Sequence, residues 1–198
     1  MNRSTTSTRT LVGVAIFTAI IFVLQFFLGA FIRFGTFSIS LVLIPIVVGA
    51  ALYGPMWGAW LGFFFGFVVL ISGDAALFLG VNPLGTILTV LIKGTLAGFA
   101  AGLVFKALEK KNMWIAAICA AIVCPVVNTG VFLLGCLLFF LPTVSSWAEA
   151  AGVDNLGVYM IVFLVGFNFV FELLLNIVFS PLILRLIKLG KNRPQYTT

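Results

Sequence analysis

Residues 11–32 read LVGVAIFTAIIFVLQFFLGAFI, a run of 22 residues without a charged side chain. A transmembrane helix needs about 20 consecutive apolar residues, so this run predicts a membrane span. The rest of the chain has the same character, since 63% of its 198 residues are hydrophobic and only 8% are charged. A soluble domain is about 45–50% apolar and about 25% charged. The composition therefore predicts an integral membrane protein and excludes a soluble enzyme.

Further apolar runs predict an all-α integral membrane protein with six transmembrane helices, forming a single domain over residues 1–198. The predicted spans are residues 11–32, 38–53, 56–72, 83–105, 114–141 and 158–187. Six spans place both chain ends on one side of the membrane, together with most of the basic residues. These residues are Arg3, Arg9, Lys106, Lys110, Lys111, Arg185, Lys188, Lys191 and Arg193. Since basic residues gather on the cytoplasmic side, both termini are predicted to be cytoplasmic.

Three of the predicted spans carry small residues at every fourth position. The stripes are Ala15 and Ala19 in the first span, Gly58, Gly62 and Gly66 in the third, and Gly94, Gly98 and Gly102 in the fourth. In lipid, small residues on one face let two helix backbones approach closely. Each stripe is therefore expected to contact another helix of this chain or a separate membrane subunit, and the sequence leaves open which.

Two ionisable residues, Lys93 and Glu172, fall inside predicted spans. Charged groups in the membrane are costly and are functional candidates for that reason. Asn168 lies four residues before Glu172 and so shares its helix face. Asn128 lies at a similar depth in the fifth span, at about 1.5 Å of rise per residue. These side chains are expected either to form a structural ion pair with amide contacts, or to line a ligand cavity.

If the ligand carries a carboxylate, Lys93 is the natural counter-charge. Two further residues near the outer ends of spans complete the candidate ligand-binding set. They are Asn82, which opens the fourth span before Pro83, and Arg33, which follows the first span.

Several other chemistries lack the residues that they need. The chain contains no histidine and only five acidic residues, so we predict no metal site and no resident cofactor. No nucleophile and base, paired aspartates or metal cluster supports catalysis, and we assign no catalytic residue. The basic residues sit at span ends and form no nucleic-acid-binding domain. We therefore expect neither an enzyme nor a nucleic-acid-binding protein.

Four features together point to one family. They are six spans in about 200 residues with cytoplasmic ends, the Ala15/Ala19 pair, the run IPIVVGAALYGP at residues 44–55 with Gly58 and Gly62 after it, and Asn82-Pro83 leading to LIKG at residues 91–94. With these features the chain resembles the substrate-binding S component of an energy-coupling factor (ECF) vitamin transporter. The resemblance covers nearly the whole chain.

This resemblance implies a subunit that captures a vitamin or related micronutrient from outside the cell and releases it inside. It implies docking on a transmembrane coupling subunit through Ala15 and Ala19, with two ATPase subunits driving transport. It also implies a location in the plasma membrane of a prokaryotic cell. The vitamin is not assigned by any motif, although Lys93 favours a ligand with a carboxylate.

Two other functions remain open from the residues alone. One is a self-sufficient secondary transporter of a small solute, with Glu172 coupling it to an ion gradient. The other is a non-transporting scaffold for envelope assembly, in which Lys93 and Glu172 would only stabilise the helix bundle.

Overall fold

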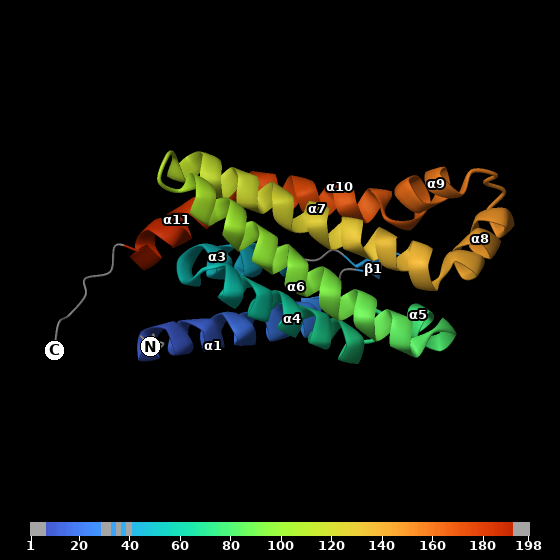
Figure 1. Cartoon of the computed structure of the whole chain (residues 1–198), viewed down its shortest axis with the longest axis horizontal. Coiled ribbons are helices and arrows are strands. Elements are labelled where there is room, and N and C mark those ends of the chain that lie inside the picture. The colour runs from blue at the N-terminus through green and yellow to red at the C-terminus, as the bar shows by residue number, and fades with distance from the viewer. Residues whose placement is uncertain (1–6, 29–32, 35–36, 39–40, 192–198) are drawn as a thin grey trace, which may run out of the picture.

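The computed structural model describes residues 7–28, 33–34, 37–38 and 41–191, and these residues are almost entirely helical (Figure 1). The helices are α1 (Thr8–Val23), the π-helix η1 (Leu24–Leu28), α3 (Leu43–Tyr53), α4 (Pro55–Ile71), α5 (Ala76–Val81), α6 (Pro83–Leu108), α7 (Met113–Phe139), α8 (Leu141–Ala150), α9 (Leu156–Val158), the π-helix η2 (Tyr159–Leu164), α10 (Gly166–Val178) and α11 (Ser180–Lys191). Two short strands, β1 (Arg33–Phe34) and β2 (Phe37–Ser38), pair as an antiparallel hairpin. Apart from this hairpin, the predicted all-helical fold is confirmed over the described residues.

Within the described residues, three helical segments are long and apolar enough to cross a membrane. They are Thr8–Phe27, α6 with 26 residues and α7 with 27 residues. A fourth span is formed if Leu156–Leu164 and Gly166–Val178 are taken together across a 47° bend. At about 1.5 Å per residue, α3 reaches only about 16 Å and α4 about 25 Å, against a hydrocarbon core of about 30 Å. The structure thus supports a multi-pass membrane protein, and the count of six spans stays a prediction.

The segment predicted as one span over residues 158–187 is divided into several helices. It begins with the π-helical turn η2 and bends where Val165 leaves the helical region, with φ −126° and ψ −18°. A second break at Phe179 separates α10 from α11. Pro181 stands in the first turn of α11, where its missing N–H costs no helical hydrogen bond. π-Helical turns commonly mark functional sites within helices, and this one lies beside the cavity described below.

The helices α4 and α6 run antiparallel and meet through their glycines. Gly58 lies against the backbone carbonyl of Gly98, and Gly62 against that of Gly94. A Cβ added at Gly66 would lie 2.7 Å from the carbonyl oxygen of Val90. The predicted stripes of the third and fourth spans therefore pack against each other, at backbone-to-backbone distance.

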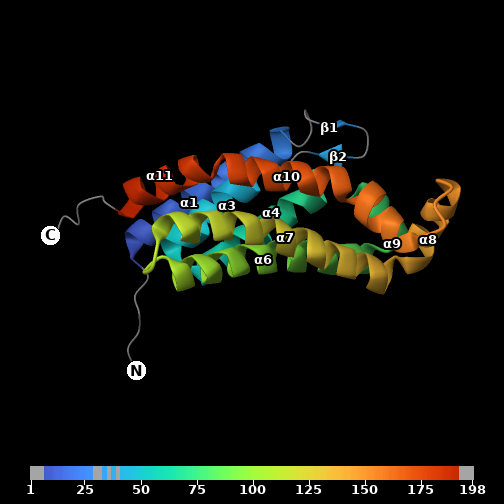
Figure 2. The same cartoon turned by 90° about the horizontal axis from the view of Figure 1, so that it is seen from above.

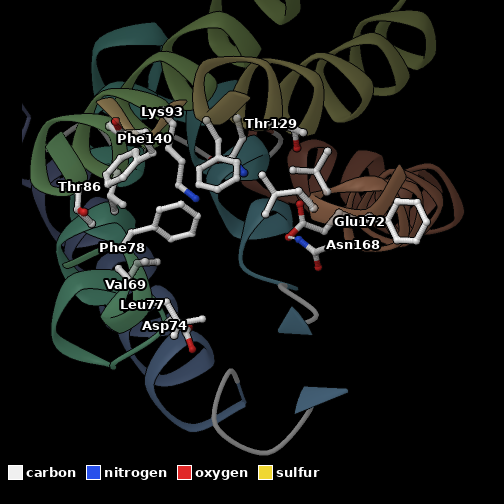
Figure 3. Close-up of a pocket in the computed structure, with 18 of the residues that line it drawn as sticks. Val69, Asp74, Leu77, Phe78, Thr86, Lys93, Thr129, Phe140, Asn168 and Glu172 are labelled. Atoms are coloured by element: carbon white, nitrogen blue, oxygen red, sulfur yellow. Dashed lines mark hydrogen bonds between the residues drawn. The ribbon is translucent and has the colours of Figure 1, made fainter. Parts of the chain in front are cut away.

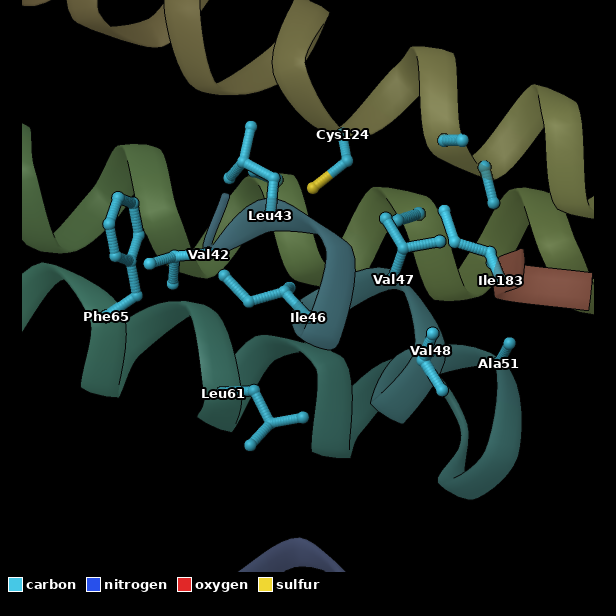
Figure 4. Close-up of a cluster of buried hydrophobic side chains, with 14 of the residues drawn as sticks. Val42, Leu43, Ile46, Val47, Val48, Ala51, Leu61, Phe65, Cys124 and Ile183 are labelled. Carbon is cyan, nitrogen blue, oxygen red and sulfur yellow. The ribbon is translucent and has the colours of Figure 1, made fainter. Parts of the chain in front are cut away.

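The helix α3 lies at the centre of the apolar core, between α4, α6, α7 and α11 (Figure 4). Its residues from Pro45 to Ala51 are all buried. Ile46, Leu61 and Ile183 are among the fully buried side chains of this core. A short helix that is buried on every side has a continuously apolar sequence, as a membrane span does. This is why the sequence predicts a membrane span there.

The bundle has two chemically different ends. The start of α1, the turn between α6 and α7, and the end of α11 lie together at one end, while α8 and α9 lie at the other (Figures 1 and 2). An ion pair between Lys191 and Glu109 joins α11 to the α6–α7 turn. Exposed basic residues gather at this end: Arg9, Lys106, Lys110, Lys111, Arg185, Lys188 and Lys191.

Candidate ligand-binding site

A cavity of about 470 Å³ lies between α6, α7 and α10, toward the end of the bundle that carries α5 and α8 (Figure 3). Its volume falls within the range of small-molecule sites, roughly 300–1,000 Å³. The wall combines apolar and aromatic side chains with a few polar ones. This combination is typical of a site that holds an organic ligand in one orientation.

The four polar residues predicted inside the membrane all line this cavity. Lys93 comes from α6, Asn128 from α7, and Asn168 and Glu172 from α10. Glu172 is only 3% exposed and Asn128 only 6%. Three separate helices thus bring one amine, one carboxylate and two amides to a shared space.

Lys93 and Glu172 do not form the direct ion pair that was one of the two predicted arrangements. The amine of Lys93 instead lies 5.1 Å from the ring centroid of Phe132, at cation–π distance. Glu172 Oε1 accepts a long hydrogen bond of 3.4 Å from Asn168 Nδ2, and its backbone carbonyl accepts one of 2.8 Å from Asn176. Figure 3 shows the two charged side chains entering the cavity from different helices.

Several buried acceptor atoms at the cavity have no hydrogen-bond partner among the described residues. They are Glu172 Oε2, Asn128 Oδ1 and Asn168 Oδ1, and the hydroxyl of Thr89 is in the same state. Buried polar groups in folded proteins are nearly always paired with protein, water or ligand. These acceptor atoms are therefore available to form hydrogen bonds with a ligand in the cavity.

An aromatic cluster borders the cavity on the side of α5 and α8. The ring of Phe78 packs edge-to-face on three others, with centroid distances of 5.5 Å to Phe132, 5.0 Å to Phe140 and 5.6 Å to Trp147. All four rings line the cavity. They supply an apolar wall with the geometry that suits a flat ring in a ligand.

Sequence reasoning misses Gln25 and Asp74, which also line the cavity. Gln25 is buried, and its Nε2 donates a hydrogen bond to Asp74 Oδ2. The available signal is that Gln25 is the one amide in the apolar run of residues 11–32. Its partner lies 49 residues away in the chain, so the contact itself has no local signature.

Of the two remaining candidates, Asn82 does not line this cavity. Asn82 is the N-cap of α6, and its side-chain oxygen accepts a hydrogen bond of 3.0 Å from the backbone N–H of Gly85. It holds the start of the helix that carries Lys93. The backbone of Arg33 pairs with Ser38 in the hairpin, and its side chain lies outside what the structure describes.

The stripe of Ala15 and Ala19 has a different setting from the glycine stripes. Both alanines are exposed, and they line a shallow groove between α1 and α4. Trp57, Trp60 and Phe64 of α4 form its other wall. Val14 and Ile21 of the same helix are buried, so α1 packs inward through a face beside the one that carries the two alanines.

A family described as the ECF transporter, substrate-specific component, matches residues 9–187 of the chain. The chain belongs to this family. The resemblance predicted from the sequence is confirmed, and the protein is a substrate-specific transporter subunit in a family that is not catalytic. Neither the secondary-transporter nor the scaffold alternative is favoured by this membership. No curated protein and no solved structure gives a significant match to the chain.

Proposed function

We propose that this S component captures a vitamin or related micronutrient in the cavity and delivers it across the prokaryotic plasma membrane. The observation that carries the proposal is the 470 Å³ cavity into which Lys93, Asn128, Asn168 and Glu172 converge from three helices. Burying polar groups in a membrane costs free energy. Glu172, Asn128 and Asn168 each keep a buried oxygen that has no hydrogen-bond partner among the described residues, so these oxygens are available to a ligand. Family membership supplies the role of substrate binding.

In this proposal, Lys93 binds a carboxylate of the ligand, while Glu172, Asn128 and Asn168 accept its hydrogen bonds. Asn82 contributes by capping α6 and so orienting the turn above Lys93. Arg33 is proposed as a second basic contact at the mouth. The aromatic cluster around Phe78 covers the ligand from the side of α5 and α8.

The groove that contains Ala15 and Ala19 is proposed as the docking face for a transmembrane coupling subunit. Two exposed small residues on one helix face let a partner helix approach closely. The aromatic wall of Trp57, Trp60 and Phe64 gives such a helix apolar surface to pack against. Two ATPase subunits, bound through the coupling subunit, would supply the energy for transport.

We propose that the end carrying α8 and α9 faces outward and that both chain ends are cytoplasmic. Support comes from the exposed basic residues at the end where α1 begins and α11 ends, because such residues favour the cytoplasmic side. Substrate would then enter from the side of the aromatic cluster.

The proposal is tested by native mass spectrometry of the protein purified in mild detergent. We expect a one-to-one adduct of vitamin size, which is lost in Lys93→Ala and Asn128→Ala. The matched control is Lys111→Ala, since this exposed lysine lies at the other end of the bundle and its loss leaves the adduct in place. A protein that carries no adduct and also binds none of a panel of vitamins contradicts the proposal.

A further inference from the structure

We infer that the ligand of this cavity is an amphoteric ring compound, with an anionic group bound by Lys93 and a protonated or N–H-rich group bound by Glu172. This inference rests on the proposed function and specifies its substrate class. It follows from the hydrogen-bond donors at one end of the cavity and the hydrogen-bond acceptors at the other end, which have no partner among the described residues.

At one end of the cavity, the amine of Lys93 has N–H donors without a hydrogen-bond acceptor among the described residues. Within that part of the chain, no hydrogen bond or ion pair reaches this amine, and the ring of Phe132 lies with its centroid 5.1 Å away. A cation–π contact occupies one face of the ammonium group and satisfies none of its three N–H donors by a conventional hydrogen bond. An anionic oxygen on the ligand supplies what this end lacks.

At the other end, the cavity presents acceptors. Glu172 Oε2, Asn168 Oδ1 and Asn128 Oδ1 are all buried without a hydrogen-bond partner among the described residues. An ionised carboxylate and a carbonyl oxygen can only accept. A second anionic group would be repelled here, whereas an ammonium, amidine or ring N–H group satisfies several acceptors at once.

The charges of the cavity also favour a ligand that carries both signs. Lys93 and Glu172 line the same space without a direct ion pair between them. Binding a simple anion would compensate Lys93 and leave an ionised Glu172 buried and uncompensated, which is costly. The third charged residue of the wall, Asp74, already accepts a hydrogen bond from Gln25. An amphoteric ligand is thus the occupant that compensates both Lys93 and Glu172.

The aromatic cluster and the volume define the rest of the ligand. Phe78, Phe132, Phe140 and Trp147 form an edge-to-face wall beside the charged groups. The cavity of about 470 Å³ lies within the roughly 300–1,000 Å³ range of sites for small organic ligands. One or two rings with short polar substituents fit this space, and the rings pack on the aromatic wall.

The test uses four probes built on one ring scaffold in three charge forms, with the full chain in lipid nanodiscs. The probes are 4-(aminomethyl)benzoate and its 3-isomer, which carry both charges, 4-methylbenzoate with the carboxylate alone, and 4-methylbenzylamine with the ammonium alone. Dissociation constants come from ligand-observed NMR. We expect one of the two amphoteric isomers to bind roughly tenfold or more tightly than either singly charged probe, since each charged hydrogen bond contributes about that factor.

Two variants then assign the two charges. In Lys93→Met the amphoteric probe should bind no better than the amine probe, and in Glu172→Gln no better than the carboxylate probe. Lys111→Met is the matched control and should keep the preference of the natural protein. Because the comparison of probes in the natural protein needs no substitution, a variant that fails to fold does not remove the test.

Three outcomes would overturn the inference. One is equal binding of 4-methylbenzoate and the amphoteric probes, which would mean that water or the protein itself satisfies Glu172. The others are a preference that neither variant changes, and binding of none of the probes. If a vitamin-sized adduct is still found by mass spectrometry, only the amphoteric class is wrong, whereas the absence of both an adduct and probe binding contradicts the proposed function as well.

Discussion

The molecule contains two kinds of small-residue stripe with the same four-residue spacing, and they lie in opposite surroundings. Gly58 and Gly62 of α4 touch the backbone of α6 so closely that no side chain fits between them. Ala15 and Ala19 of α1 are exposed in a groove. Spacing therefore predicts a face suited to close approach, while the element across from it decides whether that face stabilises the fold or is free for a partner.

The largest expected effect comes from filling the glycine contact. Gly62→Leu places a branched side chain against the backbone of Gly94, and backbone cannot move aside as a flexible side chain can. We expect a loss of about 3 kcal/mol or more in the free energy of unfolding, seen as aggregation or a strongly lowered Tm in detergent. Ala19→Leu is the control and should melt near the natural protein. Similar melting temperatures for both variants would mean that the contact between α4 and α6 is not tight.

The next effect separates stability from transport. Ala15→Leu or Ala19→Trp fills the exposed groove, so we expect uptake by cells with the complete transporter to fall to background. The purified variants should keep their Tm and their ligand, because the cavity is lined by other residues. Uptake of labelled substrate and native mass spectrometry of the same variant measure the two properties. Loss of the ligand together with uptake would show that this stripe packs inside the bundle.

The smallest effect is expected from alanine substitutions at two helical glycines that differ in their surroundings. A Cβ at Gly66 would lie 2.7 Å from Val90 O, whereas a Cβ at Gly130 of α7 meets nothing within 4 Å. We expect Gly66→Ala to lower the free energy of unfolding by about 1–3 kcal/mol. Gly130→Ala should raise it by about 0.5–1 kcal/mol, since alanine restricts the unfolded chain and favours the helix. Thermal unfolding of both proteins in one detergent checks the difference, and a shift of equal sign would contradict it.

The two long helices α6 and α7 are the part of the fold that local sequence predicts best. The predicted ranges 83–105 and 114–141 lie close to Pro83–Leu108 and Met113–Phe139. Each helix begins after an asparagine whose side chain caps it, Asn82 and Asn112. Capping and apolar length act within one segment, so they leave a readable pattern. The break of the last predicted span at Val165 and Phe179 is less readable, because apolar composition continues through it.

Part of the candidate site is predictable in the same way. Lys93, Asn128, Asn168 and Glu172 stand out because polar groups are rare in apolar runs, and the structure brings all four to one cavity. Their role as ligand contacts stays a prediction. The aromatic cluster around Phe78 is not predictable from local pattern, since a chain with 22 phenylalanines offers no way to tell a lipid-facing ring from one at a site.

The sequence by itself determined that this chain is helical, lies in the membrane, belongs to the S-component family and carries a few polar side chains within its apolar segments. These properties depend on hydrophobic composition, residue spacing and motifs, which are local. Only the tertiary structure decided that the glycine stripes of α4 and α6 pack together while Ala15 and Ala19 remain exposed. It also decided that Lys93 and Glu172 share a cavity without pairing. The reason is that helices in lipid associate through the detailed fit of their surfaces, and that fit depends on residues far apart in the chain.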